Sequence, residues 1–508
     1  MHSQVYHSHE IQAWEARWFK QQNSSFGLMQ QVAWSIAQRL EVVFSFQNTI
    51  QRIAIWCGSG NNAGDGYCLA KYLQDLGYRV TVFAAERGQS ADLAKAFHLA
   101  QTHDVNIQAH FNIENTFDCH IDALFGIGLN RDLDVTWQEI IQNFNAQSGL
   151  KIAIDVPSGL NANTGQPLPT AVKADFTYSV LGLKVGLFTG QGKEFSGKVE
   201  LISAIPTDEQ LKNIAQLSST HIVLPQRQAF GHKGSYGHVL VVGGHAEMGG
   251  AVMMAAESAF RAGAGKVTIV CDAKHHTAIL ARSPNIMLRD INALTDAEMD
   301  RLIEHVDTVS LGMGLGRDDW AKQQFLKWFP KIHQASHLQI VLDADALWFL
   351  AEDPIKLNAH TYLTPHPGEA AKLLNCSVNQ IEADRVTAIE RLQEKYAGQW
   401  VLKGAGSLIL DDQLWICTAG NAGMGTGGMG DVLAGMIASL KAQFCQNIHL
   451  HQIVTLHALA GDYLAGKGQR GVQAHHMPDA VYYVVNDCRQ SPIENEVNHH
   501  NEIFKMIR

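Results

Sequence analysis

A glycine-rich segment that ends in an acid stands directly before a long apolar stretch. Residues 421–431 read NAGMGTGGMGD, and the following sequence predicts an apolar helix over residues 431–440. Glycines let a loop turn several backbone N–H groups toward one anion, and a helix that starts there adds its dipole. Asp431 would lie beside that anion, where its carboxylate can take a proton from a hydroxyl that attacks a nucleotide's terminal phosphate. A flexible linker is the plainer interpretation, but linkers do not lead straight into an amphipathic helix.

Other turns at the ends of predicted strands in this half of the chain carry polar groups. Lys403 and Ser407, in the turn KGAGS, offer a cation and a hydroxyl to a nucleotide. The turn TPHPGE offers the imidazole of His366 and the carboxylate of Glu369, although an ordinary loop histidine explains His366 equally well. Further strand-end groups that could face the same cleft are the glycine loops 243–251 and 311–316 and the acids Asp343 and Asp345.

The N-terminal half has three glycine loops of its own. The first, GSGNNAGDG at 58–66, follows a predicted strand and opens a helix, which exposes backbone N–H groups that suit a phosphate. Its spacing fits neither the Walker A loop nor the dinucleotide-binding fingerprint, and a tight turn explains this loop alone equally well. The loops at 121–129 and 154–161 also follow strands, so in a parallel sheet all three emerge at one edge. Polar side chains that would meet there, around a phosphate-rich ligand or a hard cation, are Asn62, Asp65, Asp122, Asp155 and Ser158.

Short β-branched runs alternate with helical patterns, which predicts an α/β protein with mostly parallel sheets. The first series has helices at 11–19, 28–40, 66–76 and 91–101 and strands at 53–56, 79–83, 120–124 and 151–155. The second has a helix at 251–262, strands at 238–242, 267–270, 308–311, 340–343, 362–364 and 400–403, and a hairpin of 407–410 with 414–418. A polar helical stretch at 206–225 separates them. We predict two Rossmann-like three-layer αβα domains, at 1–210 and 220–490, and a polar tail at 491–508.

Composition excludes several classes of function. The 508 residues are 46% hydrophobic and 17% charged, as in a globular protein, and the net charge is −10 with no basic run, which argues against nucleic acid as a partner. No apolar stretch approaches the ~20 residues of a membrane span, and the first ten residues lack a signal pattern, so we expect a cytoplasmic protein without a membrane partner. The 25 histidines and eight cysteines form no HExxH or CxxC motif.

The N-terminal half resembles the NAD(P)H-hydrate epimerase domain. The resemblance rests on GSGNNAGDGYCLA, DALFGIGL and IDVPSGLNANTG, which stand in the family's order, and it covers most of residues 10–205. It implies interconversion of the R and S epimers of hydrated NADH and NADPH (NADHX and NADPHX), with a potassium ion held by Asn62, Asp122 and Ser158. The residues that it implies in contact with the hydrated dinucleotide are Asn61, Asn62, Ala63, Gly64, Asp65, Gly126, Ile127, Gly128, Leu129, Asn130, Arg131, Asp132 and Asp155.

The implied epimerisation needs the C–O bond of the hydrated carbon to break and re-form, and a positioned carboxylate can move the proton. Asp155 is our first choice for this catalytic role and Asp65 the second, while a turn cap before Pro157 is the structural alternative for Asp155. Ala63 stands where the family usually has glycine. If that position requires a positive φ, the alanine adds strain to the loop.

The C-terminal half resembles the ribokinase-like superfamily and, more closely, ADP/ATP-dependent NAD(P)H-hydrate dehydratases. The motifs HKGSYGHVLVVGG, FRAGAG, LGMGLG, LDADAL, TPHPGEA, LKGAGSLI and GMGTGGMGDVLAG follow the family's order over about residues 225–490. The resemblance implies contacts to the hydrated nucleotide from Ala251, Gly314, His366 and Asp431. For the adenine nucleotide it implies Lys403, Gly404, Ala405, Gly406, Ser407 and Gly430, with Glu369 helping to organise Mg²⁺. The loop before Ala251, HAEMGG, matches the family's usual form only in part.

Together the two resemblances predict a bifunctional repair enzyme. Asp431 would deprotonate the hydroxyl, ADP (or ATP) would phosphorylate it, and the ring nitrogen would expel phosphate to restore NAD(P)H. There are two alternatives. One is a small-molecule kinase that uses the same loop, and the other is an N-terminal half that serves only as a binding module. The resemblance also implies a homo-oligomer whose substrates are NADHX or NADPHX and ADP.

Overall fold

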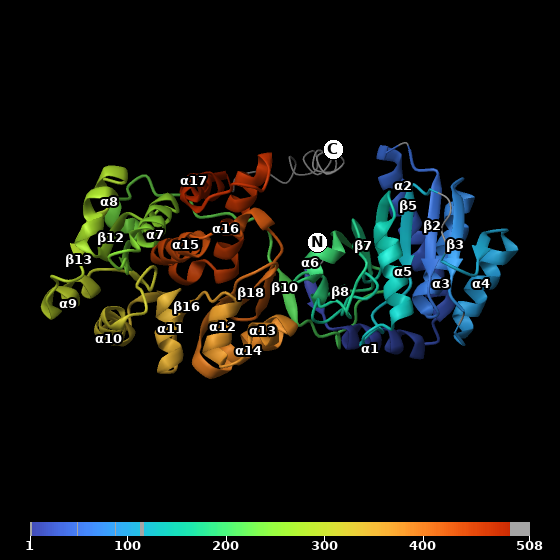
Figure 1. Cartoon of the computed structure of the whole chain (residues 1–508), viewed down its shortest axis with the longest axis horizontal. Coiled ribbons are helices and arrows are strands. Elements are labelled where there is room, and N and C mark those ends of the chain that lie inside the picture. Colours follow the sequence, from blue (N-terminus) through green and yellow to red (C-terminus); the bar gives the residue numbers. More distant parts are fainter. Residues whose placement is uncertain (1–2, 48, 87, 112–115, 488–508) are drawn as a thin grey trace. The chain divides into compact units, whose positions relative to one another are not determined.

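The computed structural model describes residues 3–47, 49–86, 88–111 and 116–487. The chain divides between Leu217 and Ser218 into two compact units, which we call the N-terminal unit and the C-terminal unit. Each is an α/β unit built on a largely parallel sheet (Figure 1). The polar tail predicted at 491–508 lies outside the described residues.

The N-terminal unit has a seven-stranded parallel sheet in the order β4-β3-β2-β5-β6-β7-β9. β2, β5 and β6 are neighbours, with Trp56 opposite Asp122 and Asp122 opposite Ala153. Their carboxyl ends therefore lie side by side, and the three glycine loops emerge at one edge as predicted. The strands are β2 (Arg52–Cys57), β3 (Arg79–Ala84), β4 (Asn106–Gln108), β5 (Cys119–Ala123), β6 (Leu150–Ile154), β7 (Phe176–Val180) and β9 (Lys198–Ile202).

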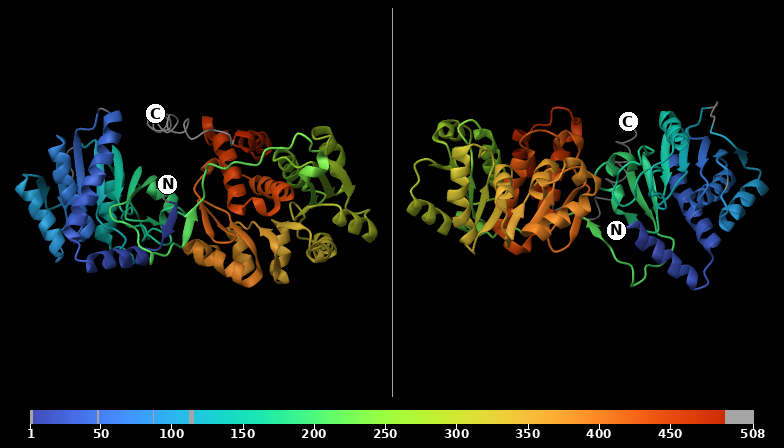
Figure 2. Two further views of the ribbon diagram at one scale, coloured as in Figure 1. Left: turned by 180° about the vertical axis from the view of Figure 1, so that it is seen from behind. Right: turned by 60° about the horizontal axis from the view of Figure 1, so that its bottom comes forward.

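Helices cover both faces of this sheet (Figures 1 and 2). On one face, Ile36 of α2 and Leu69 of α3 share a buried apolar cluster with Ile55 of β2, whereas Phe144 of α5 packs with Trp56 on the other. The helices of this unit are α1 (Ser8–Lys20), α2 (Ser25–Gln47), α3 (Asn61–Asp75), α4 (Ala91–Thr102), α5 (Val135–Ala146) and the short α6 (Gly192–Ser196).

The first glycine loop is shorter than predicted, because α3 begins at Asn61 and not at Gly66. Ala63 is therefore helical and fully buried, and its φ is not positive, so the condition under which this alanine would add strain is not met. The glycines serve close packing instead. A Cβ on Gly66 would lie 2.7 Å from the Cβ of Ala123 on β5, so this glycine lets α3 approach the sheet.

A small ribbon of three short strands completes the N-terminal unit. β1 (Gln4–Tyr6) pairs in parallel with β8 (Leu183–Lys184) and antiparallel with β10 (Ala215–Leu217). The polar helical stretch predicted at 206–225 is wrong, because the only regular element in these residues, all of which are described, is the strand β10. The pairing of β1 with β8 brings the start of α1 to the segment that carries Lys184.

The C-terminal unit has a nine-strand array in the order β13-β12-β11-β14-β15-β16-β17-β18-β19. It is parallel as far as β17, and β18 and β19 add the predicted antiparallel hairpin. The strands are β11 (His238–Val242), β12 (Lys266–Cys271), β13 (Met287–Asp290), β14 (Thr308–Leu311), β15 (Gln339–Leu342), β16 (Leu357–Leu363), β17 (Ala397–Leu402), β18 (Ser407–Leu410) and β19 (Leu414–Cys417).

Two layers of helices enclose the array of this unit, with α7, α15, α16 and α17 on one face and α10, α11, α12 and α14 on the other (Figure 1). The α-helices of the unit are α7 (Gly249–Arg261), α8 (His276–Arg282), α9 (Asp296–Glu304), α10 (Asp319–Gln334), α11 (Asp345–Glu352), α12 (Pro367–Leu374), α13 (Val378–Ala383), α14 (Arg385–Tyr396), α15 (Met429–Phe444), α16 (Leu450–Leu464) and α17 (Met477–Asp487).

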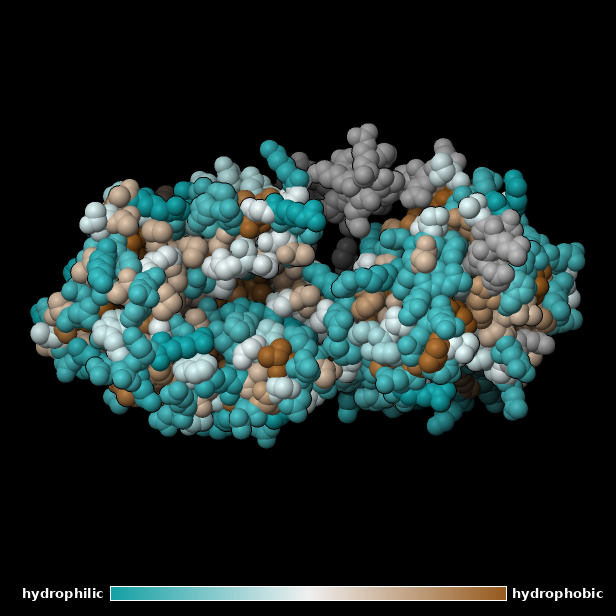
Figure 3. Space-filling view, viewed as in Figure 1, coloured by the Kyte–Doolittle hydropathy of each residue, from teal (hydrophilic) through white to brown (hydrophobic). Residues whose placement is uncertain are grey.

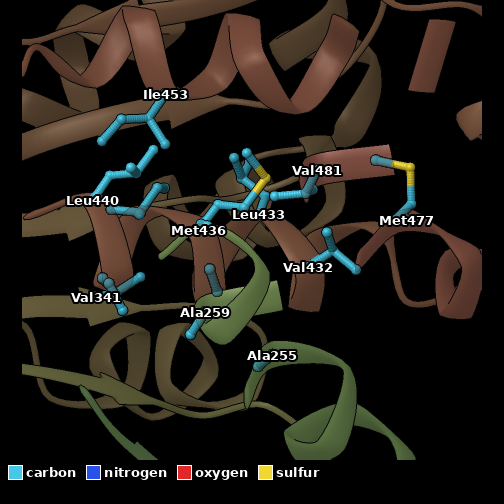
Figure 4. Packing of buried hydrophobic residues seen from close by; sticks show 14 of the residues in the cluster. Ala255, Ala259, Val341, Val432, Leu433, Met436, Leu440, Ile453, Met477 and Val481 are labelled. Atoms are coloured by element: carbon cyan, nitrogen blue, oxygen red, sulfur yellow. The ribbon is translucent and has the colours of Figure 1, made fainter. Parts of the chain in front are cut away.

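The helix that carries Asp431 is the central helix of this core. Val432, Leu433 and Met436 of α15 pack among side chains of α7, α16 and α17, as Figure 4 shows. Burial of such side chains stabilises a fold by roughly 1.5–3 kcal/mol each. This packing fixes the start of α15, and with it the position of Asp431, relative to the strand ends.

Gly435 marks the closest approach of α15 to α7, and we expect Gly435→Ala to destabilise the C-terminal unit. A Cβ there would lie 2.0 Å from the carbonyl oxygen of Ala255 and 2.2 Å from Ser258 Oγ, so the two helices must separate. The expected loss of unfolding free energy is about 1–3 kcal/mol. Gly250→Ala in α7 is the matched control, because no atom lies within 4 Å of its added Cβ. Equal urea midpoints for the two variants would contradict the prediction.

Hydrophilic residues cover most of the visible face, with single hydrophobic residues scattered among them (Figure 3). Among the described residues, no helix combines the length and the apolar character that a membrane crossing requires.

Candidate active sites

The carboxyl edge of the N-terminal sheet brings the predicted polar residues together. Asn62, in the first turn of α3, donates from Nδ2 to the carbonyl oxygen of Phe125, 2.9 Å away. Ser158 lies behind the same loop, and its Oγ accepts the N–H of Phe125 at 2.8 Å. The loop after β5 is therefore tied to the loops after β2 and β6, which forms one site from three strand ends.

Asp122 is the buried centre of this site. Its carboxylate accepts the backbone N–H of Ser158 at 2.7 Å, the hydroxyl of Ser158 at 2.6 Å and the N–H of Leu124 at 3.1 Å. Burial raises its pKa to about 6, although these hydrogen bonds lower it. Within the described part of the chain no ion pair reaches Asp122. A buried carboxylate beside a serine hydroxyl, an asparagine amide and a carbonyl oxygen is an all-oxygen set that fits a hard cation.

Asp155 lies directly after β6 and has a strained backbone. Its φ is +71°, a left-handed conformation that costs a non-glycine residue about 1–3 kcal/mol and that clusters at functional sites. The residue is 8% exposed, and one oxygen of its carboxylate accepts the N–H of Ile127 at 3.2 Å. The other oxygen forms an ion pair with Lys184, whose side chain is fully buried. Asp155 is therefore part of the polar interior of the site and not a plain turn cap.

Lys184 is the functional residue that sequence reasoning missed. It stands alone in the apolar run LGLKVGLF, where a single lysine reads as a surface residue. The apolar run was itself a signal. It predicts that the segment is buried, and a buried lysine is almost always paired with an acid.

The other residues of the N-terminal unit that were predicted to contact the dinucleotide differ in burial and in hydrogen bonding. Asp65 lies on α3 one turn after Asn62, and burial together with the charges of Asp155 and Glu15 raises its pKa well above the usual range. Gly126 packs against Asp155, since an added Cβ would lie 3.0 Å from its carboxylate. Four of the residues that follow Ile127 are exposed, whereas Leu129 is half-buried and packs against an apolar cluster. None of these five residues has a hydrogen bond to the acids among those that the structure describes; the exposed four are Gly128, Asn130, Arg131 and Asp132. Asn61 is also exposed and accepts a hydrogen bond from Ser90 at 2.6 Å.

The second site lies at the carboxyl ends of the C-terminal strands. Asp431 is in the first turn of α15, two residues after its first residue, Met429. Burial and the nearby carboxylates of Asp343 and Asp345 raise its pKa to about 7, while Lys403 acts in the opposite direction. An acid with a pKa near neutrality is suited to accept and return a proton.

Lys403 organises the floor of this site. Its Nζ is 2.9 Å from Oδ1 of Asp343 and 3.8 Å from Oε2 of Glu369. Burial raises the pKa of Glu369 to about 7. A cavity of about 390 Å³ opens beside these groups, and it is lined by His366, Pro367, Lys403, Gly404, Met424, Gly425, Thr426, Gly427 and Gly430. A glycine-walled cavity with a lysine at its floor fits a phosphate group.

The structure supports both interpretations of His366. Its Nδ1 accepts the N–H groups of Gly368 at 3.0 Å and Glu369 at 3.3 Å, so it caps α12 like an ordinary loop histidine. It also lines the cavity. Ala251 and Gly314 lie beside each other, because a Cβ on Gly314 would be 3.1 Å from the Cβ of Ala251, but neither lines the cavity. In the turn 403–407, the hydroxyl of Ser407 donates a hydrogen bond to the carbonyl oxygen of Gly404, 3.0 Å away in the same turn.

Gly430 leaves little room beside the lysine, and Gly430→Ala is expected to raise the KM for the adenine nucleotide about tenfold or more, as loss of one good contact does. An added Cβ would lie 3.0 Å from Lys403 Nζ and 3.3 Å from an Asp343 carboxylate oxygen, so this pair must move. Gly466→Ala, in the same unit but not in the cavity lining, is the control, because its added Cβ meets no atom within 4 Å. Steady-state kinetics with varied nucleotide checks the prediction, and equal KM values for both variants would contradict it.

Comparisons with known proteins agree with this division of the chain. Residues 25–186 match the family of the YjeF-related protein N-terminus, and residues 239–482 match the NAD(P)H-hydrate dehydratase family. A solved ribokinase-like superfamily protein from Enterococcus faecalis is 29% identical, with a TM-score of 0.48 over 54% of this chain and 94% of that chain.

Relatives match both halves together. The bifunctional NAD(P)H-hydrate repair enzyme Nnr of Coxiella burnetii is 37% identical over 86% of this chain and 90% of that protein. The enzyme of the same name from Escherichia coli is 34% identical over 85% of this chain and 84% of that protein. The chain therefore belongs to the family of bifunctional NAD(P)H-hydrate repair enzymes. This confirms the family predicted from the motifs, and a small-molecule kinase is not favoured.

Proposed function

We propose that this chain restores hydrated NADH and NADPH in two steps, one in each unit. The N-terminal unit interconverts the R and S epimers of NADHX and NADPHX, and the C-terminal unit dehydrates the S epimer at the expense of ADP or ATP. The observation that carries the proposal is the presence of an acid site at a parallel sheet edge in each unit: buried Asp155 with buried Asp122 in one, and half-buried Asp431 near the Lys403–Asp343 ion pair in the other. Family membership supplies the substrate class.

In the N-terminal unit, the proposed contacts to the dinucleotide come from the first turns of α3, the loop 126–132 and Asp155. Asp155 moves the proton when the hydroxyl at the hydrated carbon is exchanged. Asn62, Asp122 and Ser158 would hold a potassium ion. Their oxygen atoms fit that role, as does the buried Asp122, which forms no ion pair with any described residue. When bound, the ion would neutralise the buried carboxylate and help to bind the phosphates.

In the C-terminal unit, the residues at 403–407 and Gly430 would hold ADP, and Ala251, Gly314, His366 and Asp431 would hold S-NAD(P)HX. Asp431 accepts the proton of the substrate hydroxyl, which then attacks the terminal phosphate of ADP and releases AMP. The electron pair of the ring nitrogen expels phosphate and forms a C=N bond, and loss of a proton from the neighbouring ring carbon then forms the C=C bond of NAD(P)H. The acids Glu369 and Asp343 fit Mg²⁺, which when bound would neutralise phosphate charge.

The test uses a mixture of R and S NADHX with ADP or ATP and Mg²⁺, and it follows the absorbance of NADH. We expect recovery of all the NADH, including the share present as R epimer. Recovery that stops at the S share would contradict the epimerase, and no recovery with either nucleotide would contradict the repair function as a whole. The rates with ADP and with ATP show which nucleotide the chain uses. The rates with NADHX and with NADPHX show which hydrated substrate it prefers.

We also propose that the chain acts as a homo-oligomer, as the family resemblance implies. Light scattering of the purified chain, coupled to size-exclusion chromatography, tests this, and a mass of 55.8 kDa, that of one chain, would contradict it.

A further inference from the structure

The glycine loop before α15 uses its backbone N–H groups in two ways. The N–H of Gly423 donates to Oδ1 of Asn421 at 2.9 Å, and those of Met424 and Gly425 donate to backbone oxygens of the same turn at 3.1 and 3.2 Å. By contrast, no hydrogen bond among the described residues uses the N–H groups of residues 427–430. N–H groups left open at the start of a helix suit a phosphate group, and this part of the loop lines the cavity.

The turn that closes the first part of the loop is anchored to α16 by Asp462. One carboxylate oxygen of Asp462 accepts the N–H of Gly420 at 2.8 Å, and the other accepts a hydrogen bond from Nδ2 of Asn421 at 2.8 Å. The acid and the asparagine are 41 residues apart in the sequence. Because α16 belongs to the apolar core of the C-terminal unit, these bonds attach the loop to a fixed helix (Figure 1).

Asp462 occupies a position on α16 that is otherwise unfavourable for an acid. It lies in the last turn of this helix, which ends at Leu464, and the helix dipole disfavours negative charge there. The structure pairs its half-buried carboxylate with no cation among the residues that it describes. The two donors of the loop therefore compensate this acid, which distinguishes it from a solvated surface acid.

The carboxylate of Asp462 also decides which way the amide of Asn421 points. Oδ1 of Asn421 accepts the N–H of Gly423, so its Nδ2 has to face an acceptor. A carboxylate accepts on both oxygens, whereas an amide in its place offers one acceptor and one donor. The two loop donors are therefore both satisfied only by an acid at this position.

Two glycines allow the turn to pack closely. An added Cβ on Gly461 of α16 would lie 2.3 Å from Sδ of Met424, so the glycine lets the methionine lie against the helix. An added Cβ on Gly423 would lie 2.5 Å from the carbonyl oxygen of Gln469. Met424 also lines the cavity, so the packing that seats the turn shapes the cavity wall as well.

Building on the proposed nucleotide site, we infer that Asp462 is a positioning residue for the bound adenine nucleotide. It orients the amide of Asn421, and this amide holds the turn that leads to the open N–H groups before α15. Those N–H groups are thereby held ready for the phosphates of the nucleotide. Asp462 does not itself line the cavity, so it supports binding and takes no part in the chemical step.

The experiment exchanges the two hydrogen-bonded side chains. Asp462→Asn sets an amide against two donors, and Asn421→Asp sets two carboxylates against each other, so each single variant loses a hydrogen bond. The double variant restores the complement. The amide at position 462 then donates to the carboxylate at position 421 and accepts the N–H of Gly420, while the second oxygen at position 421 accepts the N–H of Gly423. The net charge of the chain stays the same.

Two quantities are measured on the full chain. Calorimetric titration with ADP, and with ATP in parallel, gives the Kd of each nucleotide in the presence of Mg²⁺. Steady-state formation of NADH from S-NADHX gives kcat and the KM for the nucleotide. The matched controls are Asp479→Asn, exposed on α17, and Asn447→Asp, exposed in the turn after α15.

We expect each single variant to raise the Kd and the KM for the nucleotide about tenfold or more, because it leaves a polar group of the anchor without a partner. The kcat at saturating nucleotide should stay near that of the unmodified chain, since Asp431 and Lys403 are unchanged. Independent side chains would give the double variant the product of the two losses. We expect instead that the exchange returns both constants to within about threefold of the unmodified chain. Both controls should match the unmodified chain.

Several results would overturn the inference. Single variants that bind the nucleotide as tightly as the unmodified chain are one, and a fall in kcat with an unchanged KM is another. A third is an exchanged pair that is no better than the single variants in binding or, where these unfold, in urea stability.

The two readouts separate this inference from the proposed function. An unmodified chain that binds ADP or ATP but forms no NADH contradicts the proposed dehydratase, while the titrations still decide the role of Asp462. An unmodified chain that binds neither nucleotide contradicts the proposed nucleotide site and the inference with it.

Discussion

Asp431→Asn is expected to lower the kcat of S-NADHX dehydration by about 10²–10⁴-fold, with little change in the KM for the nucleotide. The amide keeps the size of the side chain in the first turn of α15 but cannot accept the substrate proton. The nucleotide is expected to depend on Lys403 and the glycine wall, which the substitution leaves in place. Steady-state rates of NADH formation measure the loss.

The unmodified C-terminal site should lose activity as the pH falls through about 7. Asp431 acts as a base only when ionised, and burial with the charges of Asp343 and Asp345 places its pKa at about 7. The active form is therefore present above that pH and lost below it, so kcat should rise toward alkaline pH and then level off. A constant kcat down to pH 5 would contradict this role for Asp431.

Asp479→Asn is the matched control for Asp431→Asn, since this acid lies exposed on α17 of the same unit in a surface ion pair with Arg261. Its kcat should equal that of the unmodified chain. The epimerisation of R-NADHX by the Asp431→Asn chain gives a second control in the same molecule. An equal loss in both Asp variants would assign the effect to general damage and contradict a chemical role for Asp431.

The strands and their common edges could be predicted from the sequence because buried parallel strands are short runs of β-branched and apolar residues. The three runs that end in glycine loops predicted the common edge of β2, β5 and β6. Their order in the sheet, with β3 and β4 on the other side of β2, became visible only in the fold. The start of α3 could not be predicted, because its first turn, NNAGDG, is polar and rich in glycine, which is typical of a loop. Only the packing of Gly66 on Ala123 shows why this segment is helical.

The residue types of the two sites could be predicted from the sequence, but the pairs that these residues form could not. Asp431 and Lys403 were identified from their loops, whereas the ion pair of Lys403 with Asp343, 60 residues away in the sequence, required the fold. Lys184 could have been suspected from the apolar run around it, but its partner Asp155 could not have been identified. Hydrophobic periodicity does not show which charges the topology places side by side.

Asp155→Asn is expected to abolish measurable epimerisation, with a loss of about 10²–10⁴-fold, and to destabilise the N-terminal unit as well. Lys184 would remain fully buried with its main counter-charge removed, and breaking a buried pair in this way costs about 3–5 kcal/mol. The two effects are separable. Asp155→Asn combined with Lys184→Met removes both charges and should recover most of the lost stability but none of the epimerisation. Urea unfolding and R-to-S conversion measure the two quantities, and recovery of epimerisation in the double variant would show that Asp155 serves the fold alone.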